Sequence, residues 1–508
     1  MILRILFWLL GGLGIAYGSL IPFDFHPYTS ADAIARFRET PWLTLSAASR
    51  ADWIANLLLY APWAYLGMSS LGLRLGNLTA ALVVSILSVA WAIGIEFAQL
   101  YFPPRTVSLN DLAAEILGTL LGIAVWIGGH RSLTALARAA AGAGGHGALR
   151  AALVLYLLSY LVLALFPFDV VLSASEWSAK LHSDGVGWLM APATCANTHR
   201  CLAKFIVESL ATIPIGVLVG LTMAPGPGAR VGRMSALIIG LLLGLLIEGG
   251  QLLVVSGISQ GVSVLTRVLG VALGASLWSL WQRKQSMHYP DPHYLIRRLQ
   301  RFSVLALIVY LALLYVLFDL PVGFGGWLPF TDAWQRIDTL HFIPFYYHYF
   351  TSEAVAFVNL MSNLGAYSLI GCFVWLWSVD LHRGFIPGRT IILGAVAGGL
   401  VSLFVQAARL FSAALRPDPT DVLIGATGAA LAVVFCDWLW NLWIHANKRY
   451  GLPLKSGRSR FEHGFDISAY PSEKGWLGAR IVQKRVASPV TQNEKTYVQA
   501  RDGSSSSK

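Results

Sequence analysis

Long apolar runs set the hydrophobic pattern of this chain. Each is about as long as the roughly 20 residues that a helix needs to cross a membrane. Twelve such runs cover residues 3–21, 52–72, 78–102, 109–128, 149–168, 202–223, 232–256, 261–281, 302–320, 354–378, 389–411 and 420–443. They are too long and too uniformly apolar for the alternating strands of a membrane barrel. The pattern predicts an all-α polytopic membrane protein with twelve transmembrane helices.

Polar positions inside these runs recur along the chain. Residues 96–126 and residues 248–278 share one pattern, at a constant spacing of 152 positions. At this spacing identical residues align: Glu96 with Glu248, Gln99 with Gln251, Gly118 with Gly270, Gly122 with Gly274 and Trp126 with Trp278. Self-similarity at a fixed spacing indicates an internal duplication.

We divide the chain into three units of four spans each, at residues 1–130, 149–281 and 301–443. An even number of spans per unit makes the units parallel repeats. The third unit is the most diverged: Asn359 is expected to match Asn56, Gln406 to match Gln99 and Asp421 to match Asp111, while Leu403 stands where the Glu would be. The basic tail at 444–508 is too polar to bury a core, so we expect disorder there.

Charge sets the orientation and the class of partner. Only 12% of the residues are charged, against about 25% in a soluble protein. Lys and Arg concentrate on one side of the spans, which predicts cytoplasmic N- and C-termini, with longer outside loops at 22–51, 169–201 and 321–353. The net charge of +11 favours contact with anionic membrane lipids. No nucleic-acid-binding motif is visible, so no nucleic acid is expected as a partner.

The outside loops carry two further features. Cys195 and Cys201 lie close together in the second loop, where a disulfide is the favoured interpretation and a metal site with His199 is the alternative. The aromatic segment 339–350, which includes His348, is expected to be an interfacial belt, with sugar stacking as the alternative. No phosphate loop, dinucleotide motif or intramembrane metal pattern appears, so we expect no cofactor and no metal.

The first unit holds a cluster of polar residues within its apolar spans. An intramembrane carboxylate is costly and is a functional-site hypothesis by default. Glu96 and Gln99 are spaced i, i+3, and Asp111 and Glu115 are spaced i, i+4, so each pair shares one helix face. Arg105 lies in the turn between the two helices. The alternative is a polar network that only fixes helix packing, with Arg105 and Asp111 in a surface salt bridge.

These residues carry a family resemblance. The segment Asn56-Leu-Leu-Leu-Tyr60-Ala-Pro62, the pair Glu96-x-x-Gln99, Arg105, and Asp111 followed by Gly118 together resemble the VanZ-like family of bacterial membrane proteins. The resemblance covers most of residues 20–126, and Glu115 stands where the family usually has Asn. In the second unit the matching positions depart further, with Glu208 for Asn56, Gly257 for Arg105 and Ser263 for Asp111.

The resemblance implies a multi-pass protein of the bacterial inner (cytoplasmic) membrane that acts in the cell envelope. The family is associated with low-level resistance to a glycopeptide, teicoplanin, and with surface polysaccharide (exopolysaccharide). The expected partners are therefore membrane lipids, lipid-linked glycan precursors and polysaccharide-assembly proteins.

Three hypotheses for the function follow. The first is a protein that binds such intermediates or helps to process them, with Asn56, Gln99, Arg105 and Glu115 as the substrate contacts. The second is a membrane enzyme in which Glu96 and Asp111 are the catalytic acid and base and Arg105 orients a phosphate. The third is a transporter or flippase, which the one-sided position of the cluster disfavours.

Overall fold

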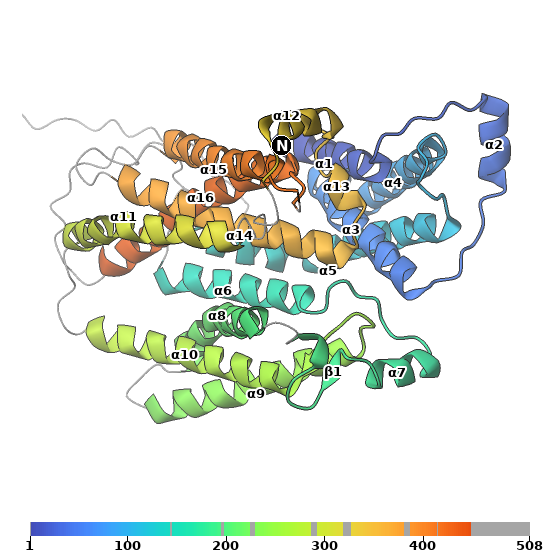
Figure 1. The fold of residues 1–508 in the computed structure, drawn as a ribbon. Helices are drawn as coiled ribbons and strands as arrows, with labels where there is room; N and C mark the ends of the chain where they lie inside the picture. Colours follow the sequence, from blue (N-terminus) through green and yellow to red (C-terminus); the bar gives the residue numbers. More distant parts are fainter. Residues whose placement is uncertain are drawn as a thin grey trace, which may run out of the picture. The chain divides into compact units, whose positions relative to one another are not determined.

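The computed structural model describes residues 2–142, 145–194, 198–223, 229–285, 292–317, 327–379, 387–413 and 415–448. Helices overlap all the predicted spans (Figure 1). Ten are long and apolar enough to cross a membrane: α1 (Ile2–Leu20), α4 (Asn77–Gln99), α5 (Leu109–Ala141), α6 (Gly145–Leu163), α8 (Thr198–Met223), α9 (Ala229–Leu252), α10 (Gly261–Gln285), α14 (Glu353–Ser378), α15 (Pro387–Leu410) and α16 (Thr420–Lys448). The all-α polytopic membrane fold is confirmed.

Two predicted spans fall outside this set. They are α3 (Ala47–Leu75), which begins with charged residues and contains Pro62, and α11 (Pro292–Leu317), which begins with an arginine-rich segment. The count of twelve spans therefore stays a prediction. Helix α16 continues to Lys448, so residues 444–448, which we expected in the tail, are helical. Residues 449–508 lie outside the described residues, and the disorder expected there stays a prediction.

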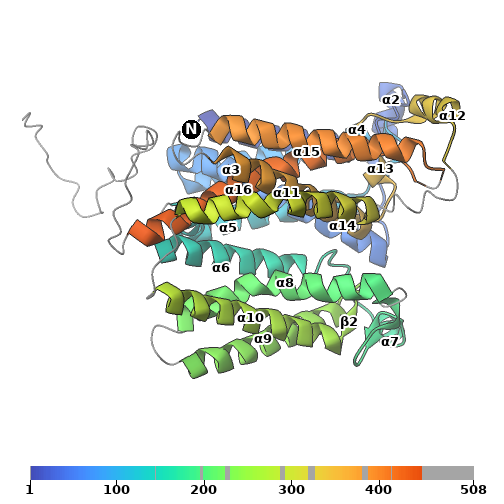
Figure 2. The same cartoon turned by 60° about the vertical axis from the view of Figure 1, so that its left-hand side comes forward.

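Short elements gather at one end of the long helices. Figure 2 shows α2 (Ser30–Arg38), α7 (Ala174–Leu181), α12 (Phe330–Gln335) and α13 (Tyr346–Tyr349) together there, with the N-terminus at the opposite end. The short strands β1 (Val186–Gly187) and β2 (Ser259–Gln260) pair in parallel; the sequence pattern did not predict them. All these elements come from the segments expected to lie outside the membrane.

Glycines let the central helices of each unit approach closely. A Cβ on Gly118 would lie 2.3 Å from the carbonyl oxygen of Leu57 in α3. A Cβ on the corresponding Gly270 of α10 would lie 2.1 Å from the carbonyl oxygen of Ser209 in α8. In the third unit, a Cβ on Gly428 of α16 would lie 2.6 Å from the carbonyl oxygen of Leu364 in α14. A side chain at any of these positions would force the two backbones apart.

Specific contacts join the units. Arg50 forms an ion pair of 2.6 Å with Glu176 of α7. This interaction holds the pKa of Glu176 down at about 2. The loop of the third unit before α14 contacts the first unit. The Tyr17 hydroxyl donates to the Pro344 carbonyl at 2.8 Å. Near it, the Arg105 guanidinium lies 4.3 Å from the ring centroid of Tyr349.

The predicted disulfide is only partly visible. Cys201 is disulfide-bonded, but Cys195, the partner that the sequence favours, lies outside the described residues. The pairing therefore stays a prediction.

Candidate functional site

The structure brings three of the predicted residues of the first unit together around the start of α5. The Asn56 amide donates to Asp111 Oδ1 at 3.0 Å. The Ser108 hydroxyl donates to Asp111 Oδ2 at 2.6 Å, and the Ser108 backbone N–H donates to Glu96 Oε2 at 3.4 Å. Ser108 caps α5 and was missed by the sequence analysis, although a Ser three residues before an Asp is a capping signal.

The side chains of Arg105 and Gln99 instead donate hydrogen bonds to backbone carbonyls at the end of α1. Arg105 Nε donates to the Ile21 carbonyl at 2.7 Å, and its Nη2 donates to the Gly18 carbonyl at 2.7 Å. The Gln99 amide donates to the Ser19 carbonyl at 3.0 Å. The last carbonyls of a helix have no partner within the helix. Both side chains therefore have a structural role, which weakens the interpretation of Arg105 as a free phosphate ligand.

The first unit contains two buried carboxyl groups. Glu96 and Glu115 are each only 2% exposed, and they lie within electrostatic reach of one another. Glu115 also interacts with the Tyr60 hydroxyl. In the second unit, the position that corresponds to Glu115 is Arg267, which forms an ion pair with Glu248. The pair of buried carboxyls therefore belongs to the first unit.

The second unit pairs the same positions, 152 residues later, with donor and acceptor exchanged between the positions of Asn56 and Asp111. The Gln260 backbone N–H donates to Glu248 Oε2 at 2.6 Å. The Ser263 hydroxyl donates to Glu208 Oε1 at 2.9 Å. The geometry of the cluster is therefore kept although most of its residues have changed.

In the third unit the donors converge on Asp421. The Asn363 amide donates to Asp421 Oδ1 at 2.8 Å, and the Gln406 amide donates to Oδ2 at 2.9 Å. Arg409 forms an ion pair with the same carboxylate at 3.3 Å. Asp421 thus takes the place that the sequence pattern gave it. Gln406 does not take the place of Gln99: its side-chain oxygen accepts from the Asp418 backbone N–H at 2.9 Å, as Glu96 accepts from the Ser108 N–H.

The predicted match of Asn359 with Asn56 is wrong. Asn363, not Asn359, makes the contact to Asp421 that corresponds to the contact of Asn56 with Asp111. The two asparagines of α14 are one helical turn apart and share a face, so the pattern alone could not separate them. A fully buried Tyr four residues later, Tyr60 in one unit and Tyr367 in the other, marks the correct register.

A cavity of about 440 Å³ lies beside Asp421, between α13, α14 and the segment that joins α15 to α16. Its lining combines basic, acidic, amide and aromatic side chains: Tyr347, His348, Asn359, Ser362, Asn363, Arg409, Arg416, Asp418 and Asp421 among others. The Arg416 guanidinium lies 4.1 Å from the ring centroid of Tyr347. The cavity can therefore offer both a cation and hydrogen-bonding groups to a ligand.

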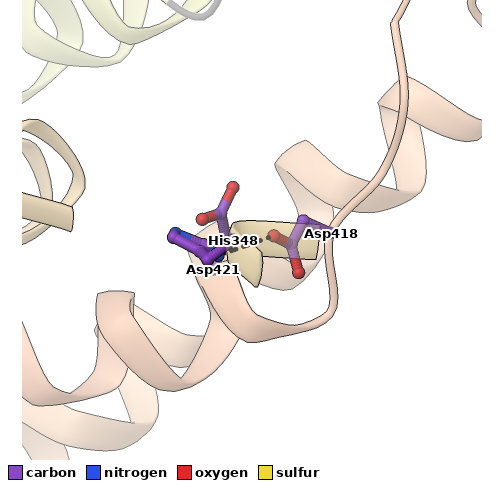
Figure 3. A group of neighbouring side chains, drawn as sticks. All are labelled: His348, Asp418 and Asp421. Atoms are coloured by element: carbon purple, nitrogen blue, oxygen red, sulfur yellow. Dashed lines mark ion pairs between the residues drawn. The ribbon is translucent and has the colours of Figure 1, made fainter. Parts of the chain in front are cut away.

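His348, Asp418 and Asp421 form a compact group in this cavity (Figure 3). One ligand atom from each lies within 4.8 Å of the others, which is close enough for a shared metal ion. His348 Nδ1 lies 3.3 Å from Asp418 Oδ2, and this carboxylate raises the pKa of His348. The sequence analysis assigned His348 to an interfacial belt, since nothing local links it to residues 70 positions later in the chain.

The comparisons with known proteins agree with the resemblance of the first unit. Residues 12–132 match the VanZ/LLP1 family model. The match spans the residues that carry the resemblance, from Asn56 to Gly118. No curated protein and no solved structure matches the chain.

Proposed function

Because residues 12–132 form a VanZ-like unit, we propose that this membrane protein binds the phosphate-bearing headgroup of a lipid-linked glycan intermediate. It does so in the cell envelope, at the outer face of the bacterial inner membrane. The cavity of about 440 Å³ beside Asp421 carries this proposal. Membrane lipids and polysaccharide-assembly proteins are the partners that such a role requires.

The lining of the cavity suits this class of ligand. The planar guanidinium of Arg416 can donate to two oxygens of a phosphate at once. Asn359 and Ser362 offer an amide and a hydroxyl to sugar hydroxyls. On the same helix, α14, the apolar side chains of Val355 and Val358 are 49% and 61% exposed. An isoprenoid chain can lie along that surface while its headgroup enters the cavity.

Arg416 provides the direct test. We expect Arg416→Ala to weaken the binding of undecaprenyl phosphate to the protein in nanodiscs by roughly 10-fold or more, as expected for the loss of a charged hydrogen bond. Undecaprenol, which lacks the phosphate, should bind weakly to both forms. Arg36→Ala is the matched control, since Arg36 also stacks on a tyrosine, Tyr28 at 4.5 Å, but does not line this cavity. Equal affinity of wild type and Arg416→Ala for the phosphate lipid would contradict the proposal.

A second candidate function rests on the carboxyl pair of the first unit. Glu96 and Glu115, each only 2% exposed, stand at the positions where the second unit has a Glu–Arg ion pair, and a buried, positioned carboxyl can act as a general acid or base. Glu96→Gln keeps the size and hydrogen bonding of the side chain but cannot exchange a proton. If the first unit catalyses a reaction on a phosphate-containing lipid, this variant should lose turnover of that lipid at normal abundance. Unchanged turnover would assign Glu96 to packing.

A further inference from the structure

We propose that His348, Asp418 and Asp421 bind one divalent transition-metal cation, such as Zn²⁺, at the side of the cavity. This inference adds a metal site to a region for which the sequence predicted none. It does not depend on the lipid ligand, because the metal can be measured with no lipid added.

The donor atoms and their spacing fit such an ion. One imidazole nitrogen and two carboxylate oxygens are ligands that Zn²⁺ accepts, whereas Ca²⁺ and Mg²⁺ prefer oxygen alone. Two ligands on bonds of about 2.0 Å at a tetrahedral metal lie about 3.3 Å apart. His348 Nδ1 and Asp418 Oδ2 are 3.3 Å apart. The Asp421 carboxylate completes the group within 4.8 Å, a span that small side-chain rotations can close.

The His348 ring has an ion-pair contact, Nδ1 to Asp418 Oδ2 at 3.3 Å, but no hydrogen bond of good geometry among the described residues. Both ring nitrogens are buried, and neither makes a hydrogen bond within the part of the chain that the structure describes. The whole side chain is only 12% exposed. Buried polar atoms are nearly always satisfied in folded proteins. A metal ion bound to one ring nitrogen would account for the position of this imidazole against two carboxylates.

The surroundings hold both carboxylates in place. The Thr420 backbone N–H donates to Asp418 Oδ1 at 2.9 Å. Asn363 donates to Asp421 Oδ1 at 2.8 Å. Such outer hydrogen bonds orient ligands in known metal sites. Gln406 and Arg409 share the other oxygen of Asp421, so this carboxylate would bind the ion through a remaining lone pair. Three protein ligands would leave the fourth position of a tetrahedral Zn²⁺ for water or a ligand.

Zinc binding by the purified, untagged full-length protein tests the site. The protein is first stripped of metal with a chelator and then dialysed against buffered Zn²⁺, and bound metal is counted by mass spectrometry. We expect one tightly bound Zn²⁺ per chain, and about 100-fold weaker binding after His348→Ala or Asp418→Asn. His26→Ala is the matched control, because His26 also lies beside a carboxylate, Asp24 at 3.8 Å, but is exposed and has no third ligand among the described residues.

Folding of each variant is checked by gel filtration in detergent, and Asp418→Asn serves as the nearly isosteric variant if His348→Ala misfolds. Wild-type protein that takes up no stoichiometric Zn²⁺ would overturn the inference without reference to any variant. So would tight zinc binding that both ligand variants keep. Neither result would bear on the lipid proposal, which is measured through Arg416.

Discussion

Asp421 accepts hydrogen bonds from side chains of two other helices. Asn363 lies on α14, and Gln406 and Arg409 lie on α15. The carboxylate is only 4% exposed, so each donor that is lost leaves a buried charge less satisfied. A single residue therefore ties the last three helices of the third unit together beside the cavity.

Removal of one donor should show this dependence. Asn363→Ala leaves Asp421 Oδ1 without its amide donor, and we expect it to lower the free energy of unfolding by about 1–3 kcal/mol. Asn359→Ala is the control one helical turn away; its side chain is exposed, so the change should stay within about 0.5 kcal/mol. Thermal unfolding in detergent measures both. A larger effect at Asn359 would restore the register that the sequence suggested.

At the scale of elements, the sequence predicts the helices, but not which distant segments pack against one another. Apolar runs long enough to span a membrane leave helix as the backbone structure available to them, so every predicted span contains one. The first-unit cluster was also within reach, because Glu96, Asn56 and Asp111 lie on consecutive helices. The cavity was not: His348 meets Asp418 only through tertiary packing, and α13 is too short to leave a periodic signal.

Close helix contact makes Gly118 sensitive to the smallest side chain. A Cβ there would lie 2.3 Å from the Leu57 carbonyl, so we expect Gly118→Ala to cost about 1–3 kcal/mol of stability, as overpacking usually does. Gly94→Ala is the control, since nothing lies within 4 Å of a Cβ at that position. Thermal unfolding of the two variants should separate them clearly. Equal melting temperatures would mean that α3 and α5 can move apart without cost.

At the scale of the whole molecule, polar side chains connect the units. Arg50 is only 5% exposed and joins the first unit to α7 of the second through Glu176. The pKa of Glu176 is lowered to about 2 in the fold, from about 4.3 in an unfolded chain. The ion pair therefore makes its full contribution to stability at pH values above about 4.3. That contribution is lost as the pH falls through about 2.

The pH dependence of the Arg50–Glu176 ion pair can be measured. Glu176→Gln removes the titrating group, so the variant should melt at a lower temperature than wild type at pH 7. The difference should shrink as the pH is lowered from about 4 toward about 2, where Glu176 takes up its proton in the wild type. Scanning calorimetry at several pH values follows both proteins. A difference that stays constant across this range would show that the ion pair does not contribute.

The topology of the whole chain is also testable. The Lys and Arg asymmetry predicts that reporter fusions after residues 185 and 335 face the periplasm and that a fusion after residue 290 faces the cytoplasm. The gathering of α2, α7, α12 and α13 at one end of the helices agrees with a shared side for the first two positions. A cytoplasmic signal at residue 185 would overturn the whole topology assignment.

Helix α13 has a position with consequences beyond packing. Its residues Tyr347 and His348 line the cavity of the third unit, while the next residue, Tyr349, covers the arginine that holds the end of α1. A ligand or ion that shifts this single turn would also move Tyr349 against Arg105 of the first unit. Coupling between two binding sites is reciprocal: a first-unit ligand whose affinity changes when the cavity is filled would change the affinity of the cavity by the same factor.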